Sequence, residues 1–171
     1  MENILGTPPP APPANVPPLP ERKGTQTMTM RQQMAEHRDN PVCASCHKMM
    51  DGLGLALENF DQAGRWRSVD QGADSRNSKF VSIDASGNFP DGEPFEGIVG
   101  LRQGVIKRAD LFYSTFTEKL LTYALGRGLE YYDMPTVRAI DRDAANAQYR
   151  FSSVVLDIVN SLPFQMRRSQ S

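Results

Sequence analysis

The feature that most constrains this chain is the pentapeptide Cys43-Ala44-Ser45-Cys46-His47, which holds its only two cysteines and one of its two histidines. Two residues between the cysteines match the spacing of the two vinyl groups of a porphyrin, so both thiols can form thioether bonds to one haem. The adjacent histidine is then delivered to the iron as the proximal ligand. The motif therefore predicts one covalent haem c, held by Cys43 and Cys46 and ligated by His47.

Other interpretations of the cysteine pair stay open beside the haem. A structural zinc site needs four ligands, and only His37 or a carboxylate could join the three residues of the motif. A redox-active pair of the thioredoxin type needs a βαβ context, which the surrounding sequence does not show. A disulfide between the two cysteines would close a loop too small to give much stability. A chance match is the last alternative.

Two residues compete for the sixth position on the iron. His37 lies six residues before Cys43, and the turn at Asn40-Pro41 can carry it to the opposite face of the haem. Met134, in a loop before the last helix, is the alternative, and an open position is the third. We favour His37. A histidine–methionine pair raises the reduction potential, two histidines lower it, and an open position permits peroxide or oxygen chemistry.

A tetrapeptide with two arginines follows the motif at residues 64–67. Within it, Arg65, Trp66 and Arg67 offer cationic and N–H donors, which partly buried haem propionates require. We therefore predict that these three residues bind the propionates. The alternative is an arginine-rich loop that simply faces water.

Composition excludes several classes of function. The net charge of −1 and the sequence pI of about 6.1 provide no field that would attract nucleic acid. No apolar run approaches the roughly 20 residues that span a bilayer, and no secretory signal is visible at the N-terminus. With 171 residues and 39% hydrophobic content, the chain can form a modest domain whose core a cofactor completes.

The chain divides by composition into four segments. Residues 8–20 contain eight prolines, which predicts a proline-rich extended arm or linker over 1–24. A helical haem-attachment segment follows over 25–67, and a turn-rich β-hairpin insertion over 68–108. Residues 109–171 form a C-terminal helical segment that completes the haem domain.

Local patterns place the individual elements. Helical periodicity predicts helices at 25–39, 55–61, 109–125 and 136–160, the last with a break near 146–150. Alternation at 80–84, with turn residues over 84–92, predicts one small hairpin. Gly6 is predicted to cap a short N-terminal helix, and Pro135 to lie in the first turn of the last helix. The predicted fold is mainly α, a small cytochrome c-like helical domain around one haem.

Five blocks of the sequence, in this order, resemble the C-terminal tail of the planctomycete-type cytochrome c-like multidomain proteins, which ends in two tandem domains of unknown function. These blocks are residues 2–19, 37–67, 84–92, 116–140 and 151–168. The resemblance implies a secreted or periplasmic haem protein with further domains upstream, of which this chain is the tail. It places the haem roles on Cys43, Cys46 and His47 and includes His37 ahead of them. Gly52 departs from the family, whose members usually have proline there, and this softens the turn after His47.

We therefore expect a c-type cytochrome domain that transfers electrons outside the cytoplasm, in the periplasm or another extracytoplasmic compartment. Its partners are an unidentified redox protein and the upstream domains or other subunits of a larger complex. One alternative is a haem enzyme, peroxidase-like or carbohydrate-oxidising, with an open sixth position. The other is a docking or assembly module in which haem is structural. In each case the haem completes the core, so the haem-free chain should be poorly folded.

Overall fold

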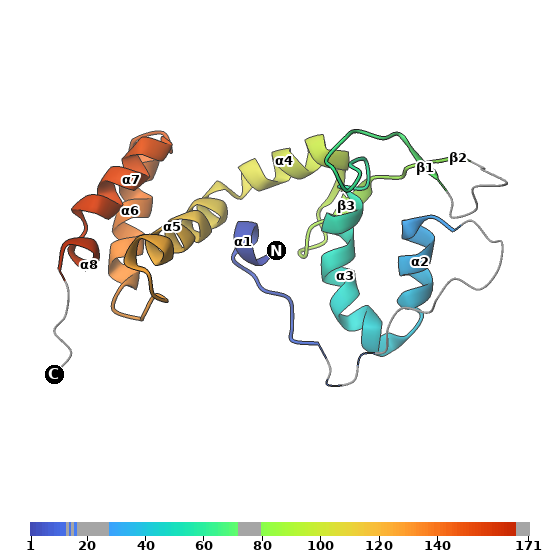
Figure 1. Ribbon diagram of the computed structural model, residues 1–171, viewed down its shortest axis with the longest axis horizontal. Coiled ribbons are helices and arrows are strands. Elements are labelled where there is room, and N and C mark those ends of the chain that lie inside the picture. The colour runs from blue at the N-terminus through green and yellow to red at the C-terminus, as the bar shows by residue number, and fades with distance from the viewer. Residues whose placement is uncertain (13, 15, 17–27, 72–79, 167–171) are drawn as a thin grey trace. The chain divides into compact units, whose positions relative to one another are not determined.

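The computed structural model describes residues 1–12, 14, 16, 28–71 and 80–166 (Figure 1). The chain is mainly helical, as the sequence predicted, and it divides into two compact units. We call residues 9–104 the N-terminal unit, and residues 1–8 together with 105–171 the C-terminal unit. No helix in the described part of the chain is both long and apolar enough to cross a membrane.

The predicted proline-rich arm is described only in part. Residues 13, 15 and 17–24 lie outside the described residues, so the expected polyproline conformation stays a prediction. Residues 8–12 belong to no helix or strand, and all five are exposed. Because proline lacks a backbone N–H, a segment of this composition contributes few hydrogen bonds to either unit.

Two of the helices in the N-terminal unit meet at a sharp corner, where α2 packs beside α3 (Figure 1). Helix α2 (Met30–His37) begins with a capping box between Thr29 and Gln32. Helix α3 (Pro41–Leu55) begins shortly after α2 ends, because Asn40 caps it and proline fits the first helical position. Of the helix predicted over 25–39, residues 25–27 lie outside the described residues, the helix is confirmed over Met30–His37, and residues 28–29 and 38–39 are not helical.

The chain after α3 differs from the prediction. A helix was expected over 55–61, but α3 ends at Leu55 and residues 57–59 form turns, so that prediction is wrong. The competing local structure is built by Asp61, whose side chain accepts the backbone N–H groups of Ala63 and Arg65. Such side-chain bonds to nearby backbone N–H groups favour a loop over a helix.

Gly52 also lies in a different setting from the one the sequence suggested. It stands inside α3, which continues unbroken to Leu55, so no turn follows His47 at this point. A Cβ atom on Gly52 would lie 2.6 Å from the backbone carbonyl oxygen of Asn88 and 2.8 Å from its backbone nitrogen. Glycine is therefore needed for the close approach of α3 to strand β3.

The insertion contains two small antiparallel hairpins rather than the single one predicted. Strand β1 (Val69–Gln71) pairs with β2 (Phe80–Ser82), and β3 (Ser86–Asn88) pairs with β4 (Pro94–Glu96). Strand β3 of the second hairpin lies within residues 84–92, which were predicted to form turns, and β4 follows that stretch. Arg31 of α2 donates to the carbonyl oxygens of Asp84, at 2.8 Å, and of Ser86, which fastens α2 to the start of this hairpin.

Helix α4 (Gly97–Lys107) was not predicted. Its glycines at 97, 100 and 104 lower intrinsic helix propensity and conceal the pattern. Within the N-terminal unit they serve close packing instead, because a Cβ atom on Gly104 would collide with the ring of Phe89. Phe89 is 1% exposed and also contacts Phe95, with ring centroids 4.8 Å apart.

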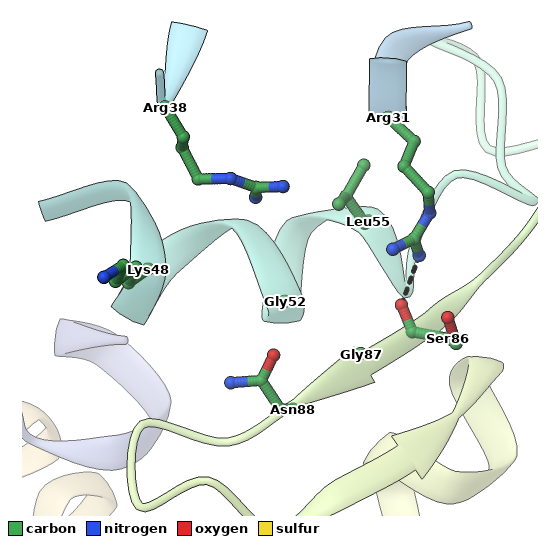
Figure 2. Close-up of a pocket in the computed structure, with 8 residues that line it drawn as sticks. All are labelled: Arg31, Arg38, Lys48, Gly52, Leu55, Ser86, Gly87 and Asn88. Atoms are coloured by element: carbon green, nitrogen blue, oxygen red, sulfur yellow. Dashed lines mark hydrogen bonds between the residues drawn. The ribbon is translucent and has the colours of Figure 1, made fainter. Parts of the chain in front are cut away.

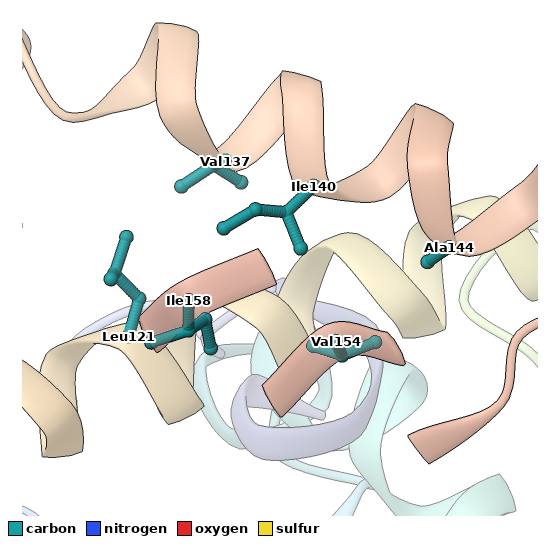
Figure 3. Close-up of a cluster of buried hydrophobic side chains, with 6 residues drawn as sticks. All are labelled: Leu121, Val137, Ile140, Ala144, Val154 and Ile158. Carbon is teal, nitrogen blue, oxygen red and sulfur yellow. The ribbon is translucent and has the colours of Figure 1, made fainter. Parts of the chain in front are cut away.

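The C-terminal unit consists of helices around an apolar cluster (Figure 3). Its helices are α1 (Glu2–Leu5), α5 (Ala109–Leu125), α6 (Met134–Asn146), α7 (Phe151–Asn160) and α8 (Leu162–Gln165). The buried cluster consists of Leu121, Val137, Ile140, Ala144, Val154 and Ile158. Gly6 and Gly126 end α1 and α5 in the left-handed conformation, and the break between α6 and α7 falls at residues 147–150. The Gly6 cap, the end of the helix predicted over 109–125 and the break near 146–150 are confirmed, as is Pro135 in the first turn of α6.

Candidate haem-attachment site

Helix α3 carries the whole predicted attachment motif in its first two turns. Asn40 caps the helix by accepting the backbone N–H two residues later, at 3.0 Å, and Pro41 takes the first position, where no N–H is needed. Cys43 and His47 are four residues apart and therefore lie on one face of the helix, with Cys46 beside them. Both thiols are free and partly exposed, so they are open to covalent attachment.

A buried carboxylate holds the ring of His47. Its Nδ1 lies 2.8 Å from Oδ1 of Asp51, one helical turn further along α3. The Asp51 side chain is only 8% exposed, and its Oδ2 accepts a second bond of 2.8 Å from Arg38. A carboxylate only accepts, so His47 donates from Nδ1, and in the neutral ring Nε2 keeps the free lone pair. One nitrogen of the ring is thereby left for a metal.

The second histidine lies against the first. The ring centroids of His37 and His47 are 4.6 Å apart, and the ring planes meet at 84° in an edge-to-face contact. The Asn40-Pro41 corner thus brings His37 to the predicted proximal ligand. The rings leave no space for an iron ion between them, so both can ligate one iron only after they move apart.

Met134, the alternative sixth ligand, belongs to the C-terminal unit. It begins α6 and packs, partly buried, against the core cluster that includes Leu121 and Val137. Apolar packing accounts for a methionine at this position without any metal. The choice between His37 and Met134 as the sixth ligand stays a prediction.

The two arginines of the predicted propionate-binding loop are already paired with carboxylates. Nε of Arg65 donates to Asp61 at 2.9 Å, and the Arg65 side chain is 81% exposed. Arg67 binds Glu58 at 2.8 Å and Asp70 at 3.2 Å. Each guanidinium would therefore have to share or exchange a partner in order to bind a propionate.

The rest of this loop is ordered around Asp61. Hydrogen bonds, above all from the backbone N–H of Arg65, hold the pKa of the Asp61 carboxyl below its usual value. Trp66 meets Phe60 edge to face at a centroid distance of 5.4 Å, but its side chain stays largely exposed. The loop is a well-built surface feature, and its contact with a haem stays a prediction.

A pocket of about 370 Å³ lies beside α3 (Figure 2). Its lining residues are Arg31, Arg38, Lys48, Gly52, Leu55, Ser86, Gly87 and Asn88. The lining includes three cations and no acidic side chain, so the pocket favours an anionic group. Arg31 is tied to backbone carbonyls and Arg38 to Asp51, whereas Lys48 is exposed and has no ion-pair partner among the described residues.

Sequence reasoning missed Asp51 although a signal was present, because a carboxylate four residues after a histidine faces it within a helix. It missed Arg38 because the partner lies 13 residues away across a helix corner. The pocket depends on β3, which no local pattern places against α3. For the zinc alternative, no group of three or more His, Cys, Asp or Glu side chains that could hold a metal ion occurs in the described ranges.

Two sequence families match this chain. Residues 1–70 match the family described as "Protein of unknown function (DUF1588)", and residues 91–164 match the one described as "Protein of unknown function (DUF1585)". This tandem pair of domains confirms the resemblance to the C-terminal tail of the planctomycete-type proteins. Neither description gives an activity or a cofactor. No curated protein and no solved structure matches the chain.

Proposed function

We propose that this chain, which matches these two domain families in tandem, is a c-type cytochrome domain that transfers electrons outside the cytoplasm. The observation that carries the proposal is the geometry at the start of α3, where two free thiols stand beside a histidine with one uncommitted ring nitrogen. Asp51 holds Nδ1 of His47, so Nε2 is available to iron. These residues fit a covalently attached haem.

Each residue of the motif has one role in this proposal. Cys43 and Cys46 form the thioethers, and His47 is the proximal ligand. His37 is the proposed sixth ligand, because the fold already places its ring against His47. When bound, the haem supplies one-electron chemistry through the ferric and ferrous states of its iron. The chain would contribute the imidazole rings of His37 and His47 as iron ligands, and the corner between α2 and α3 holds these rings together.

The pocket beside α3 offers a haem propionate a second partner besides the loop of Arg65, Trp66 and Arg67. A partly buried carboxylate binds most strongly to a cation that has no other anion to satisfy. The two loop arginines are already paired, whereas Lys48 has no ion-pair partner in the part of the chain that the structure describes. We therefore place one propionate at Lys48 and keep the loop as the alternative.

The proposal includes a compartment and partners. Haem attachment through this motif takes place on the outer side of the cytoplasmic membrane, which puts the chain in the periplasm or another extracytoplasmic space. Electron transfer requires a redox partner protein, and the upstream domains or other subunits of a larger complex are further proposed partners. A docking or assembly role with structural haem would keep the same attachment chemistry without exchange of electrons.

A haem enzyme, peroxidase-like or carbohydrate-oxidising, is the second candidate function. The bond between His47 and the buried Asp51 favours it, because a carboxylate behind a metal-bound imidazole makes that ligand more electron-donating. The position of His37 favours electron transfer instead, since it puts a sixth ligand within reach of the site.

Production of the chain in a host competent for haem c maturation tests the proposal. We expect haem staining that survives denaturing electrophoresis and a low-spin optical spectrum in both oxidation states. The double variant Cys43→Ser/Cys46→Ser should lose the stain, and a wild-type chain without covalent haem would contradict the proposal.

The sixth ligand is then decided by two single variants. His37→Ala should convert the spectrum to high spin, whereas Met134→Leu should leave it unchanged. The reverse result would transfer the role to Met134. A high-spin wild-type spectrum with rapid binding of added ligands would favour the enzyme over electron transfer.

A further inference from the structure

Behind His47 a chain of two hydrogen bonds leads away from the motif, from the imidazole to Asp51 and on to Arg38. Both bonds measure 2.8 Å, and each uses a different oxygen of the same carboxylate. Covalent attachment of a haem would require only the two cysteines, so these two hydrogen bonds are not needed for it. The chain of bonds therefore calls for a role of its own.

We propose that Asp51 is the positioning residue of the proximal histidine, and that the Asp51–Arg38 pair sets the reduction potential of the haem iron. This inference rests on the proposed haem function. Asp51 fixes the tautomer and plane of the His47 ring, and its negative charge makes the ring a stronger electron donor. Arg38 limits that effect by drawing part of the charge to the other carboxylate oxygen.

Burial makes the carboxylate effective. The Asp51 side chain is 8% exposed, whereas the side chains of His47 and Arg38 are 26% and 28% exposed. A charge that water barely reaches acts on its neighbours through a lower effective dielectric constant than a surface charge does. Ordinary surface pairs at the same helical spacing contribute little, so the buried position separates Asp51 from a routine helix ion pair.

The two residues that bind Asp51 come from different elements, which also supports a positioning role. His47 and Asp51 lie on α3, whereas Arg38 follows the end of α2. The carboxylate is thus held from both sides of the helix corner, and it cannot rotate without breaking one of the two bonds. A ring tied to such an anchor keeps one orientation, as second-layer partners of metal-bound histidines generally require.

The direction of each effect follows from charge. A negative charge near the iron stabilises the ferric over the ferrous state and lowers the potential, and a positive charge raises it. Removal of the Asp51 charge should therefore raise the potential, and removal of the Arg38 charge should lower it. A purely structural pair would instead change both variants in the same way, since either one breaks the same bond.

The test compares holoproteins by spectroelectrochemistry. Asp51→Asn keeps the shape and removes the charge, and we expect about a tenfold rise in the ferrous-to-ferric ratio at fixed ambient potential, a shift of about 59 mV for one electron. Arg38→Gln should shift the potential in the opposite direction. Asp39→Asn is the matched control, because it removes one negative charge from an exposed side chain of the same corner and should change the ratio by less than about twofold.

A second readout reports on the ring itself. In the ferrous low-spin protein, the Nδ1 proton of His47 should be visible by NMR and slow to exchange, and Asp51→Asn should shift it and speed its exchange. Asp51→Glu restores the charge and should return the potential most of the way to the wild-type value.

The outcomes separate this inference from the proposed function. Absence of covalent haem from the wild-type chain would overturn both the proposed function and this inference. If every variant carries haem but the reduction potential of Asp51→Asn equals that of Asp39→Asn, only this inference is overturned. Potentials that move in the same direction in Asp51→Asn and Arg38→Gln also overturn it. If Asp51→Asn fails to mature, the lower potential expected of Arg38→Gln still decides the question.

Discussion

The two units of this chain are stabilised by different means. The C-terminal unit buries a cluster of five branched aliphatic side chains and one alanine from three helices, which is sufficient for an ordinary small core. Among the described residues of the N-terminal unit, the buried hydrophobic side chains are Ala44, Leu55, Ala56, Ala85 and Phe89. Three of these five are alanines, and α2 buries no residue at all.

This difference agrees with the proposed position of the haem. Burial of apolar area is the main favourable term in folding, and alanine contributes little of it. The unit with the sparse core is the one that carries the two thiols and both histidines of the chain. A haem attached there would supply the apolar surface that the side chains lack, whereas the C-terminal unit needs no such addition.

The largest expected effect is loss of haem. In the full chain with Cys43→Ser and Cys46→Ser, amide exchange in α2 and α3 should accelerate by about tenfold or more, because the apolar surface that completes this unit is missing. In α5, α6 and α7 it should stay within about twofold of the holoprotein. Hydrogen–deuterium exchange with peptide-level mass spectrometry measures both. Equal loss of protection in the two units would break the contrast.

The next effect tests the C-terminal core directly. Leu121 is fully buried, so Leu121→Ala should lower the free energy of unfolding of its unit by about 3 kcal/mol through lost burial and a cavity. Leu156→Ala, at a side chain 60% exposed, is the control and should cost less than about 0.5 kcal/mol. Denaturant unfolding followed by far-UV circular dichroism gives the values. A changed haem spectrum in Leu121→Ala would argue against independent cores.

A pair of glycines in α3 tests the N-terminal unit in the same way. Gly52→Ala should destabilise it by about 2 kcal/mol, since the new methyl group overlaps the backbone of Asn88. Gly54→Ala meets no atom within 4 Å and should stabilise the helix by about 0.8 kcal/mol through propensity alone. Haem absorbance during denaturant unfolding is the probe. Two variants of the same sign would show that α3 does not approach β3 so closely.

The sequence predicted the C-terminal unit better than the N-terminal one, and the reason is physical. Helices that bury one face on a protein core must repeat apolar residues at helical spacing. Helices α5, α6 and α7 can therefore be predicted from their own short stretches of sequence. The positive φ of Gly126 and the break before Phe151 are likewise local signals.

The N-terminal unit is shaped by contacts that no short window contains. The hydrogen bonds from Arg31 to Asp84 and Ser86, at the start of the β3 hairpin, span more than 50 residues. The need for a glycine at position 104 of α4 is explained only by its contact with Phe89. Asp61 overrides the helical pattern of residues 55–61 with its own hydrogen bonds. The motif could be recognised in the sequence because the proposed haem attachment requires a fixed spacing, whereas the residues proposed to tune the haem are brought together by the fold.

The smallest predicted effect concerns a buried carboxylate in the C-terminal unit. Asp133 is 0% exposed and accepts two bonds from Arg127, at 2.7 and 3.0 Å, and one from the backbone of Glu130 at 2.9 Å. The Arg127 bonds come first among the causes that hold the pKa of Asp133 below its usual value, and burial opposes them. Asp133→Asn should therefore cost about 1.5 kcal/mol at neutral pH, the range for a hydrogen bond to a charged group.

The sign of its pH dependence follows from that lowered pKa. A carboxyl with a depressed folded-state pKa stabilises the fold above its unfolded pKa of about 3.9, and this stability is lost as the pH falls through the folded value. The difference between wild type and Asp133→Asn in denaturant unfolding should thus be constant from pH 7 to about pH 5 and shrink below about pH 4. Because the pair belongs to the C-terminal unit, haem-free and haem-bound chains should give the same curve. A difference that grows on acidification would show that Asp133 is not held as a charged acceptor, and a curve that depends on haem would show that the two units do not unfold separately.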